Sequence, residues 1–197
     1  MARRGDGGRR QRQRRQQVQY EELDKYPVMP PHAFARIVRD LRTLNIIYQV
    51  IEPPLTKKEE EVRSEIMTIF IQALTADIEE IDANPVLYLR AAMDQIIKSY
   101  RLKVNKKSRS KIFYYLKRDL IGYGRMDVLM NDANVEDVSL DGTNIPIFAY
   151  HRKFESVETT IAWPDDVELE SYVIKLAQRC GKHISVAEPL LDATLMD

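Results

Sequence analysis

The sequence predicts an α+β fold, in which a small helical module with a β-hairpin is followed by a small α/β sheet domain. Three observations support this prediction. Apolar residues recur at helical spacing over residues 57–82 and 85–102. Two short runs before them are rich in β-branched and aromatic residues, as strands are. Beyond residue 122, short alternating runs surround one amphipathic stretch, which is typical of strands packed with a helix.

Residues 1–17 form an arginine-rich tail. They hold seven arginines against one acid, although the whole chain has no net charge. Met1 and Ala2 are their only apolar residues, so the tail cannot bury enough surface to fold and is predicted to be disordered. Such a charge block suits a tether to anionic lipid, nucleic acid or an acidic protein surface; a solvated arm without a partner is an equal alternative. The arginines of this candidate tether are Arg3, Arg4, Arg9, Arg10, Arg12, Arg14 and Arg15.

The hairpin is predicted over residues 33–51. Residues 33–39 and 46–51 have strand composition and residues 40–45 would join them, although a single helix over 33–48 is the alternative. The proline-rich stretch before the hairpin, residues 26–31, resists helix formation.

Two helices with start signals follow the hairpin. Thr56 and Glu59 have the spacing of a capping box at the start of the first helix. Asn84 and Pro85 open the second, as N-cap and first helical residue. The short link between them predicts that the two helices lie face to face.

A third helix is predicted over residues 109–121. The segment before it, residues 103–111, has five cations and no acid, and we interpret it as a linker in which Ser108 or Ser110 caps the helix. Two glycines, Gly122 and Gly124, follow where a helix C-cap belongs.

The rest of the chain is predicted to form the sheet domain. Asp141 and Gly142 signal a tight turn, and a helix is expected from Pro164 to about residue 180, where Gly181 caps it. The expected strands are residues 135–140, 145–150, 153–161, 184–186 and 190–195.

No catalytic or metal site can be recognised from the residues. The sequence has no G-x-x-x-x-G-K-[ST] phosphate loop, and its three histidines are scattered. The single cysteine, Cys180, lies on the apolar side of the last helix and is interpreted as core; one cysteine fits a cytoplasmic protein. The longest apolar run, residues 66–74, is far shorter than the roughly 20 residues of a membrane helix.

Five sequence blocks resemble, in order, the N-terminal region of the archaeal type II/IV secretion ATPases, the hexameric motors that assemble archaeal pili and archaella. The blocks are GYGRMDVLM (122–130), VEDVSLDG (135–142), PIFAYH (146–151), LAQRCGKHIS (176–185) and PLLDATL (189–195). In that family the last block continues into Asp-Gly-Ser-Arg and then a RecA-like domain with the phosphate loop. The resemblance therefore implies that the chain is the N-terminal fragment of a longer motor, cut at Asp197. Met196 stands where the family usually has proline.

The resemblance implies a function as well as a fold. The second domain would be the secretion-ATPase N-terminal type, and it would couple ATP-driven motion to a membrane platform protein at the inner face of the cell membrane. Its partners would be its own RecA-like domain, neighbouring subunits of a homohexamer and, through the tail, the anionic membrane surface. ATP and Mg²⁺ would bind the full-length parent, whereas the fragment itself would hold no cofactor.

The family also supplies basic residues from this domain to the nucleotide cleft. The candidates here are Arg179 and Arg152, and Lys175 lies beside Arg179 on a helix face expected to be open to a partner. An arginine can make a bidentate contact to phosphate. The alternative for Arg179 is a cation that complements a helix C-terminus, and a structural role is favoured more strongly for Arg152 and Lys182.

A second reading is a nucleic-acid-binding module that uses the tail and the basic segment 103–111. Few aromatic residues accompany these cations, which disfavours stacking on bases. The predicted organisation is a disordered tail (1–17), a helical module with the hairpin (18–104) and the α/β domain (105–197).

Overall fold

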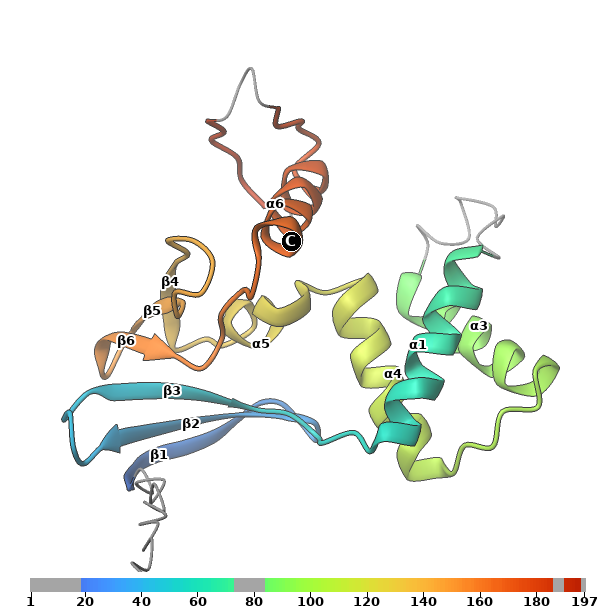
Figure 1. The fold of residues 1–197 in the computed structure, drawn as a ribbon, viewed down its shortest axis with the longest axis horizontal. Coiled ribbons are helices and arrows are strands. Elements are labelled where there is room, and N and C mark those ends of the chain that lie inside the picture. Colours follow the sequence, from blue (N-terminus) through green and yellow to red (C-terminus); the bar gives the residue numbers. More distant parts are fainter. Residues whose placement is uncertain (1–18, 73–83, 186–189, 196–197) are drawn as a thin grey trace, which may run out of the picture.

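The computed structural model describes residues 19–72, 84–185 and 190–195, and within them the chain is an α+β protein with a six-stranded mixed sheet and five α-helices (Figure 1). The strands are β1 (Tyr20–Met29), β2 (Ala33–Asp40), β3 (Ile46–Ile51), β4 (Val135–Ser139), β5 (Phe148–His151) and β6 (Glu155–Thr159). The helices are α1 (Lys57–Gln72), α3 (Pro85–Ser99), α4 (Lys106–Leu120), α5 (Asp127–Met130) and α6 (Asp166–Arg179), with a 3-10 turn, η1 (Gly124–Met126), before α5.

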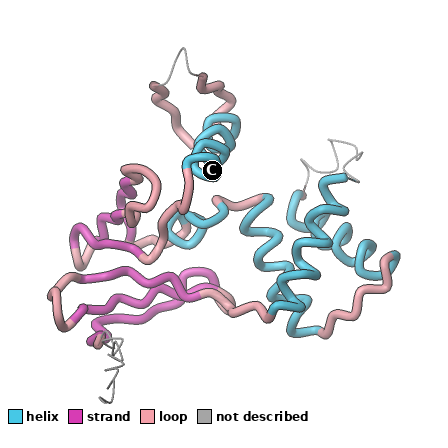
Figure 2. Tube along the Cα trace, in the orientation of Figure 1, coloured by secondary structure: helices cyan, strands magenta, loops and turns pink. Residues whose placement is uncertain are grey.

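The strands, drawn in magenta in Figure 2, come from residues 20–51 and 135–159 and form one sheet in the order β1-β2-β3-β6-β5-β4. Its central pair, β3 and β6, is parallel, with Tyr48 opposite Thr159, and every other neighbouring pair is antiparallel. The sheet therefore spans position 104/105, where the sequence predicts a division between two domains.

The predicted hairpin is confirmed as β2 and β3, which excludes the alternative of one helix over residues 33–48. In its turn the Asp40 carboxylate accepts a hydrogen bond from the Arg42 backbone N–H at 2.8 Å, and Leu44 adopts a left-handed conformation with φ 63°. Strand β1 was not predicted. It lies at the sheet edge, and its register shifts between Pro27 and Met29. A proline is tolerated at an edge or a bulge, because it has no N–H to donate to a second neighbour.

Helices α1, α3 and α4 form a helical trio, inserted between β3 and η1, that lies beyond one end of strands β1–β3 (Figure 1). The trio has its own apolar core. That core consists of Ile66, Leu89, Met93, Ile96, Ile112 and Leu116. Burying the apolar stripe of each helix against the other two stabilises helices that would be marginal alone.

The capping signals of the first two helices are confirmed. The Thr56 N–H donates to the Glu59 carboxylate at 2.8 Å, while Thr56 Oγ1 accepts from the Glu59 N–H at 3.3 Å. The Asn84 side chain accepts from the Leu87 N–H at 3.0 Å, with proline at the first helical position. The predicted end of the first helix falls in residues 73–83, outside the described residues. The second helix ends at Ser99, a few residues before its predicted end.

The third helix, α4, begins at Lys106 and not at residue 109. Its N-cap is Asn105, whose side chain accepts a hydrogen bond from the Ser108 N–H at 2.9 Å, so neither Ser108 nor Ser110 is the cap. Asparagine is among the strongest N-cap residues, and with Asn105 as the cap the helix begins about one turn earlier than predicted.

The last predicted helix is confirmed as α6, with Asp165 as N-cap and Gly181 in the left-handed conformation (φ 65°) after its end. The predicted strands at 145–150 and 153–161 are shorter, as β5 and β6. The strand predicted at 190–195 is wrong: these residues form no strand, and Leu190 is 92% exposed. Residues 184–185 are not in a strand either, and residue 186 lies outside the described residues. Alternation of apolar and polar residues does not make a strand unless a neighbouring strand provides backbone hydrogen-bond partners.

Candidate functional site

Two predicted basic residues, Lys175 and Arg179, fasten α6 to the C-terminal end of α4. Lys175 Nζ donates to the Asp119 carbonyl at 2.6 Å, and Arg179 Nη1 donates to the Gly122 carbonyl at 2.7 Å. The Arg179 guanidinium also lies 4.3 Å from the centre of the Tyr123 ring. We call these five residues the α4–α6 joint.

The α4–α6 joint corrects one expectation. Lys175 and Arg179 were predicted to lie on a face open to a partner, but both are half-buried and engaged with α4. The final carbonyls of a helix lack partners within the helix and carry partial negative charge, so cations bind there. In this structure Arg179 binds a carbonyl just beyond the C-terminus of α4, which is the kind of contact that the alternative to nucleotide binding predicts. Burial lowers the pKa of the Lys175 ammonium.

A different side of α6 from the joint is open. Ala177 is the one fully buried residue of this helix, and Tyr172 packs on Trp163 with ring centroids 4.8 Å apart. Val167 is 73% exposed and Ile174 38% exposed. These two residues are seven positions apart, which places them on one face of the helix. Cys180, predicted as core, is only partly buried.

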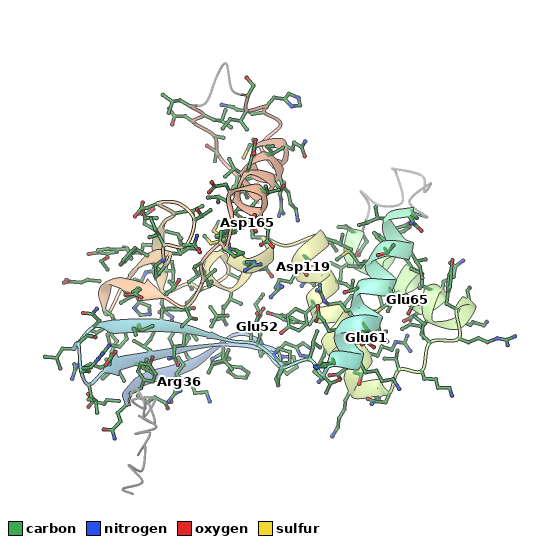
Figure 3. The ribbon with its side chains drawn as sticks, in the orientation of Figure 1. Arg36, Glu52, Glu61, Glu65, Asp119 and Asp165 are labelled. Carbon is green, nitrogen blue, oxygen red and sulfur yellow. The ribbon has the colours of Figure 1, made fainter. Side chains whose placement is uncertain are left out.

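A charged network underlies the joint and ties the trio to the sheet. Arg118 Nη1 binds both Glu52 carboxylate oxygens at 2.9 and 2.8 Å, and Arg118 Nε binds Asp119 at 2.8 Å. Asp119 also binds Arg63 of α1 at 2.9 Å, and the Tyr114 hydroxyl donates to Glu52 at 2.7 Å. Figure 3 shows Glu52 and Asp119 at the junction of sheet and helices. Asp119 thus joins this network through its side chain and the α4–α6 joint through its carbonyl.

The corner after α4 is closed by Asp127, which is 6% exposed. Its Oδ1 accepts a hydrogen bond from the Tyr123 N–H at 2.8 Å, and burial raises the pKa of this carboxyl. The Gly122 N–H donates to the Lys117 carbonyl at 2.9 Å, in agreement with the predicted C-cap position. Gly124 follows in the left-handed conformation, with φ 56°.

A second buried polar cluster was missed by sequence reasoning. The hydroxyls of Tyr26 and Tyr48 both donate to Asp132 Oδ2, at 2.7 and 2.6 Å, and Tyr26 also contacts His151 Nε2 at 3.0 Å. His151 Nδ1 accepts from the Lys153 N–H at 3.1 Å, so its proton sits on Nε2 and is donated to Tyr26. Burial lowers the pKa of His151, which keeps the ring neutral. No short motif could have revealed this cluster, because Tyr26 and His151 are 125 positions apart.

Arg152, the other predicted nucleotide-contacting residue, lies in a separate environment from Arg179. Its side chain is 63% exposed, and its Nε pairs with Glu136 of β4 at 3.0 Å. Lys182, weighed beside it, donates to the Asp192 carbonyl. The structure does not bring Arg152 and Arg179 into one site, and contact with nucleotide stays a prediction for both.

The basic segment 103–111 is partly neutralised. Lys111 pairs with Glu59 at 2.8 Å, and Arg109 pairs with Asp94 of α3. The three cations of this segment for which the described residues contain no ion pair are Lys103, Lys106 and Lys107. The segment is therefore less available to nucleic acid than its composition predicts.

The seven arginines of the predicted tether lie outside the described residues. Across residues 19–72, 84–185 and 190–195, no group of three or more His, Cys, Asp or Glu side chains could hold a metal ion. Over the same ranges, no helix has the length and apolar character needed to cross a bilayer.

The chain is similar to three uncharacterized proteins of Methanocaldococcus jannaschii, and no family model matches it. MJ1288 is 40% identical over 151 residues, which are 76% of this chain and 60% of that protein. MJ0900 is 31% identical over 156 residues, covering 78% of this chain and 27% of the relative, and MJ0781 is 36% identical over 86 residues, covering 43% and 11%. The chain thus spans 60% or less of each of these relatives, in which the shared segment is accompanied by further sequence.

Proposed function

We propose that this chain is the N-terminal coupling and regulatory module of a hexameric ATPase motor that powers the assembly of archaeal pili or archaella, or a related secretion process. Its sheet would then be of the secretion-ATPase N-terminal type. Three of the five resembling blocks fall on elements that meet in the fold, namely η1–α5, β4 and β5, and Arg179 of the block at the end of α6 binds Gly122 of the first block. The recurrence of the segment within longer relatives fits a module that works with a further domain.

The observation that carries the proposal is the position of α6. Polar contacts at the α4–α6 joint hold one side of this helix, while two apolar side chains, Val167 and Ile174, are exposed on another. In Figure 1, α6 lies apart from α1, α3 and strands β1–β3, and the α4–α6 joint links it to the end of α4. A helix that packs on the sheet core through Leu169 and Tyr172 and still exposes Val167 and Ile174 suits a surface that a RecA-like ATPase domain, of the same or a neighbouring subunit, covers during its cycle.

Nucleotide would act on this helix through Arg179. The Gly122 carbonyl now accepts one hydrogen bond from this guanidinium. A phosphate oxygen is a stronger acceptor because it is charged, so a phosphate brought near by the RecA-like domain competes for Arg179 and loosens the α4–α6 joint. ATP and Mg²⁺ belong to that domain. The platform protein would receive the motion. The tail would bind an anionic membrane surface.

The proposal is tested by combining the chain with a RecA-like motor ATPase domain of the resembled family, encoded in the same genome. We expect the two to co-purify and the chain to change the rate of ATP hydrolysis. Ile174→Asp should abolish both effects, because a carboxylate cannot be buried in an apolar contact without a large cost. Leu87→Asp is the matched control, since Leu87 is an apolar residue of α3 that is 62% exposed. Absence of co-purification, or equal loss in both variants, contradicts the proposal.

A further inference from the structure

Two adjoining cavities form a continuous groove along α3 and α4. The larger, of about 550 Å³, lies between the two helices, and the second, of about 260 Å³, continues to the β1–β2 turn. The two share Arg90, Ser110 and Phe113 in their walls. Midway along, Ser110 Oγ lies 3.1 Å from His32 Nε2 of the β1–β2 turn. We call this feature the α3–α4 groove.

The groove is lined by cations. Arg90, Lys106 and Lys117 contribute to its walls, and within the described residues none of them makes an ion pair. Arg109 lines the groove as well but is paired with Asp94. Among the lining residues that the structure describes, Asp127 is the one carboxylate, and its Oδ1 accepts from the Tyr123 N–H. Three uncompensated positive charges along a cleft attract an anionic ligand.

The floor of the groove is apolar and does not suit nucleic-acid bases. Met93 is 1% exposed, and Phe113 packs against the core of the trio. The Arg90 guanidinium covers the Phe113 ring, 4.3 Å from its centre. Because this ring is already covered, it offers no free face on which a base could stack. The groove therefore provides positive rims and shallow apolar slots but no stacking platform.

The length of the groove matches a short stretch of extended chain. Lys106 and Lys117 lie near its two ends, eleven residues apart on α4, which is about 16 Å at the rise of an α-helix. An extended peptide covers this distance with about five residues. Its alternate side chains point in opposite directions, so one set can enter the apolar floor while the other meets the cations.

We propose that the α3–α4 groove binds an extended acidic segment of a partner protein, in which carboxylates alternate with apolar residues. Arg90, Lys106 and Lys117 would pair with the carboxylates, and the apolar side chains would lie against Val104 and beside the edge of Phe113. The positive charges of the groove walls favour an acidic segment as the ligand. The inference is independent of the proposed motor function, since it uses none of α6, Arg179 or Arg152.

The test measures fluorescence anisotropy of a labelled peptide of about seven residues, alternating glutamate and leucine, with the full 197-residue chain. We expect saturable binding that weakens with added salt and is lost when glutamine replaces glutamate in the peptide. Lys106→Glu should weaken binding about tenfold, and Lys106→Arg should preserve it. Lys107→Glu is the matched control: Lys107 is the next residue of the same helix, it is exposed, and the lining of the groove does not include it.

Each contrary result overturns the proposal in a recognisable way. An equal loss of affinity in Lys106→Glu and Lys107→Glu would mean that the peptide responds only to the overall charge of the chain and not to the groove. No loss in either variant would move binding to another surface, such as the arginine-rich tail. Tighter binding of a labelled oligothymidylate of similar length would make the ligand a nucleic acid. Self-association on sedimentation without peptide binding would make the groove a contact between copies of the chain.

Discussion

At the residue scale, Gly122 is required by a close approach and not by its backbone conformation. It does not share the positive φ of Gly124, yet a Cβ placed on it would lie 2.3 Å from Asp127 Oδ1 and 2.9 Å from the Arg118 carbonyl. Asp127 is buried and cannot withdraw without losing its bond to Tyr123. We expect Gly122→Ala to lower the free energy of unfolding by about 1–3 kcal/mol in urea titrations. Gly124→Asn, which meets open space and suits a left-handed residue, should change it little; an equal loss in both would refute the argument.

Glu59 gives a residue-scale prediction about pH. The hydrogen bond from Lys111, followed by that from Thr56, lowers the pKa of the Glu59 carboxyl from 4.5 to about 2. A carboxyl whose pKa is lowered in the folded state stabilises the fold above its unfolded pKa, and this contribution is lost as pH falls. The difference in unfolding free energy between wild type and Glu59→Gln should therefore be constant near neutral pH, shrink below about pH 4.5 and vanish near pH 2. Glu65→Gln, an exposed residue of the same helix, is the control. A difference that persists unchanged at pH 2 would argue against this ion pair.

At the scale of elements, local signals predicted local structure. The N-caps predicted for α1 and α3 were correct because an N-cap needs only residues a turn away. Strand β1 was missed because Pro27 within it and the two prolines just after it argue against a strand until its place at the sheet edge is known. Residues 190–195 have strand-like alternation but no neighbouring strand, and a strand forms only when its backbone pairs with another strand. Spacing placed Lys175 and Arg179 off the apolar stripe of α6, but it could not reveal that this side meets α4.

The α4–α6 joint gives the prediction at this scale. If Lys175 and Arg179 hold α6 in place, Lys175→Met and Arg179→Gln should each speed amide hydrogen exchange in α6 about tenfold, because a hydrogen bond from a charged group contributes about 1.5 kcal/mol. Exchange in α4 should rise less, since the charged network with Glu52 still anchors it. Arg152→Gln is the control, an exposed ion pair worth little. If exchange in α6 rises equally in Lys175→Met, Arg179→Gln and Arg152→Gln, the α4–α6 joint is not what holds this helix.

At the scale of the whole molecule, two apolar cores are joined by a smaller buried cluster of Ala33, Tyr114 and Val128. The trio packs around one apolar core and the sheet around another. Arg118 with Glu52 and Asp132 with Tyr48 connect segments on opposite sides of position 104. Neither the parallel pairing of β3 with β6 nor the cluster around Asp132 follows from any local pattern, because each joins residues at least 84 positions apart. Sequence reasoning therefore reached the fold class and most elements but not the arrangement that unites them.

This arrangement predicts how the chain divides when it is cut. A fragment of residues 55–121 contains every residue of the trio core, so it should be helical by circular dichroism and should melt cooperatively, with the low stability expected of so small a domain. A fragment of residues 105–197 loses β3, the parallel neighbour of β6, and leaves Asp132 without Tyr26 and Tyr48. An unpartnered buried carboxylate and an exposed strand edge both oppose folding, so this fragment should show neither cooperative melting nor dispersed amide signals in nuclear magnetic resonance spectra. The opposite result, in which residues 105–197 fold alone and residues 55–121 do not, would support the division at 104/105 predicted from the sequence. It would also show that the pairing of β3 with β6 and the bonds of Asp132 to Tyr26 and Tyr48 are not needed for folding.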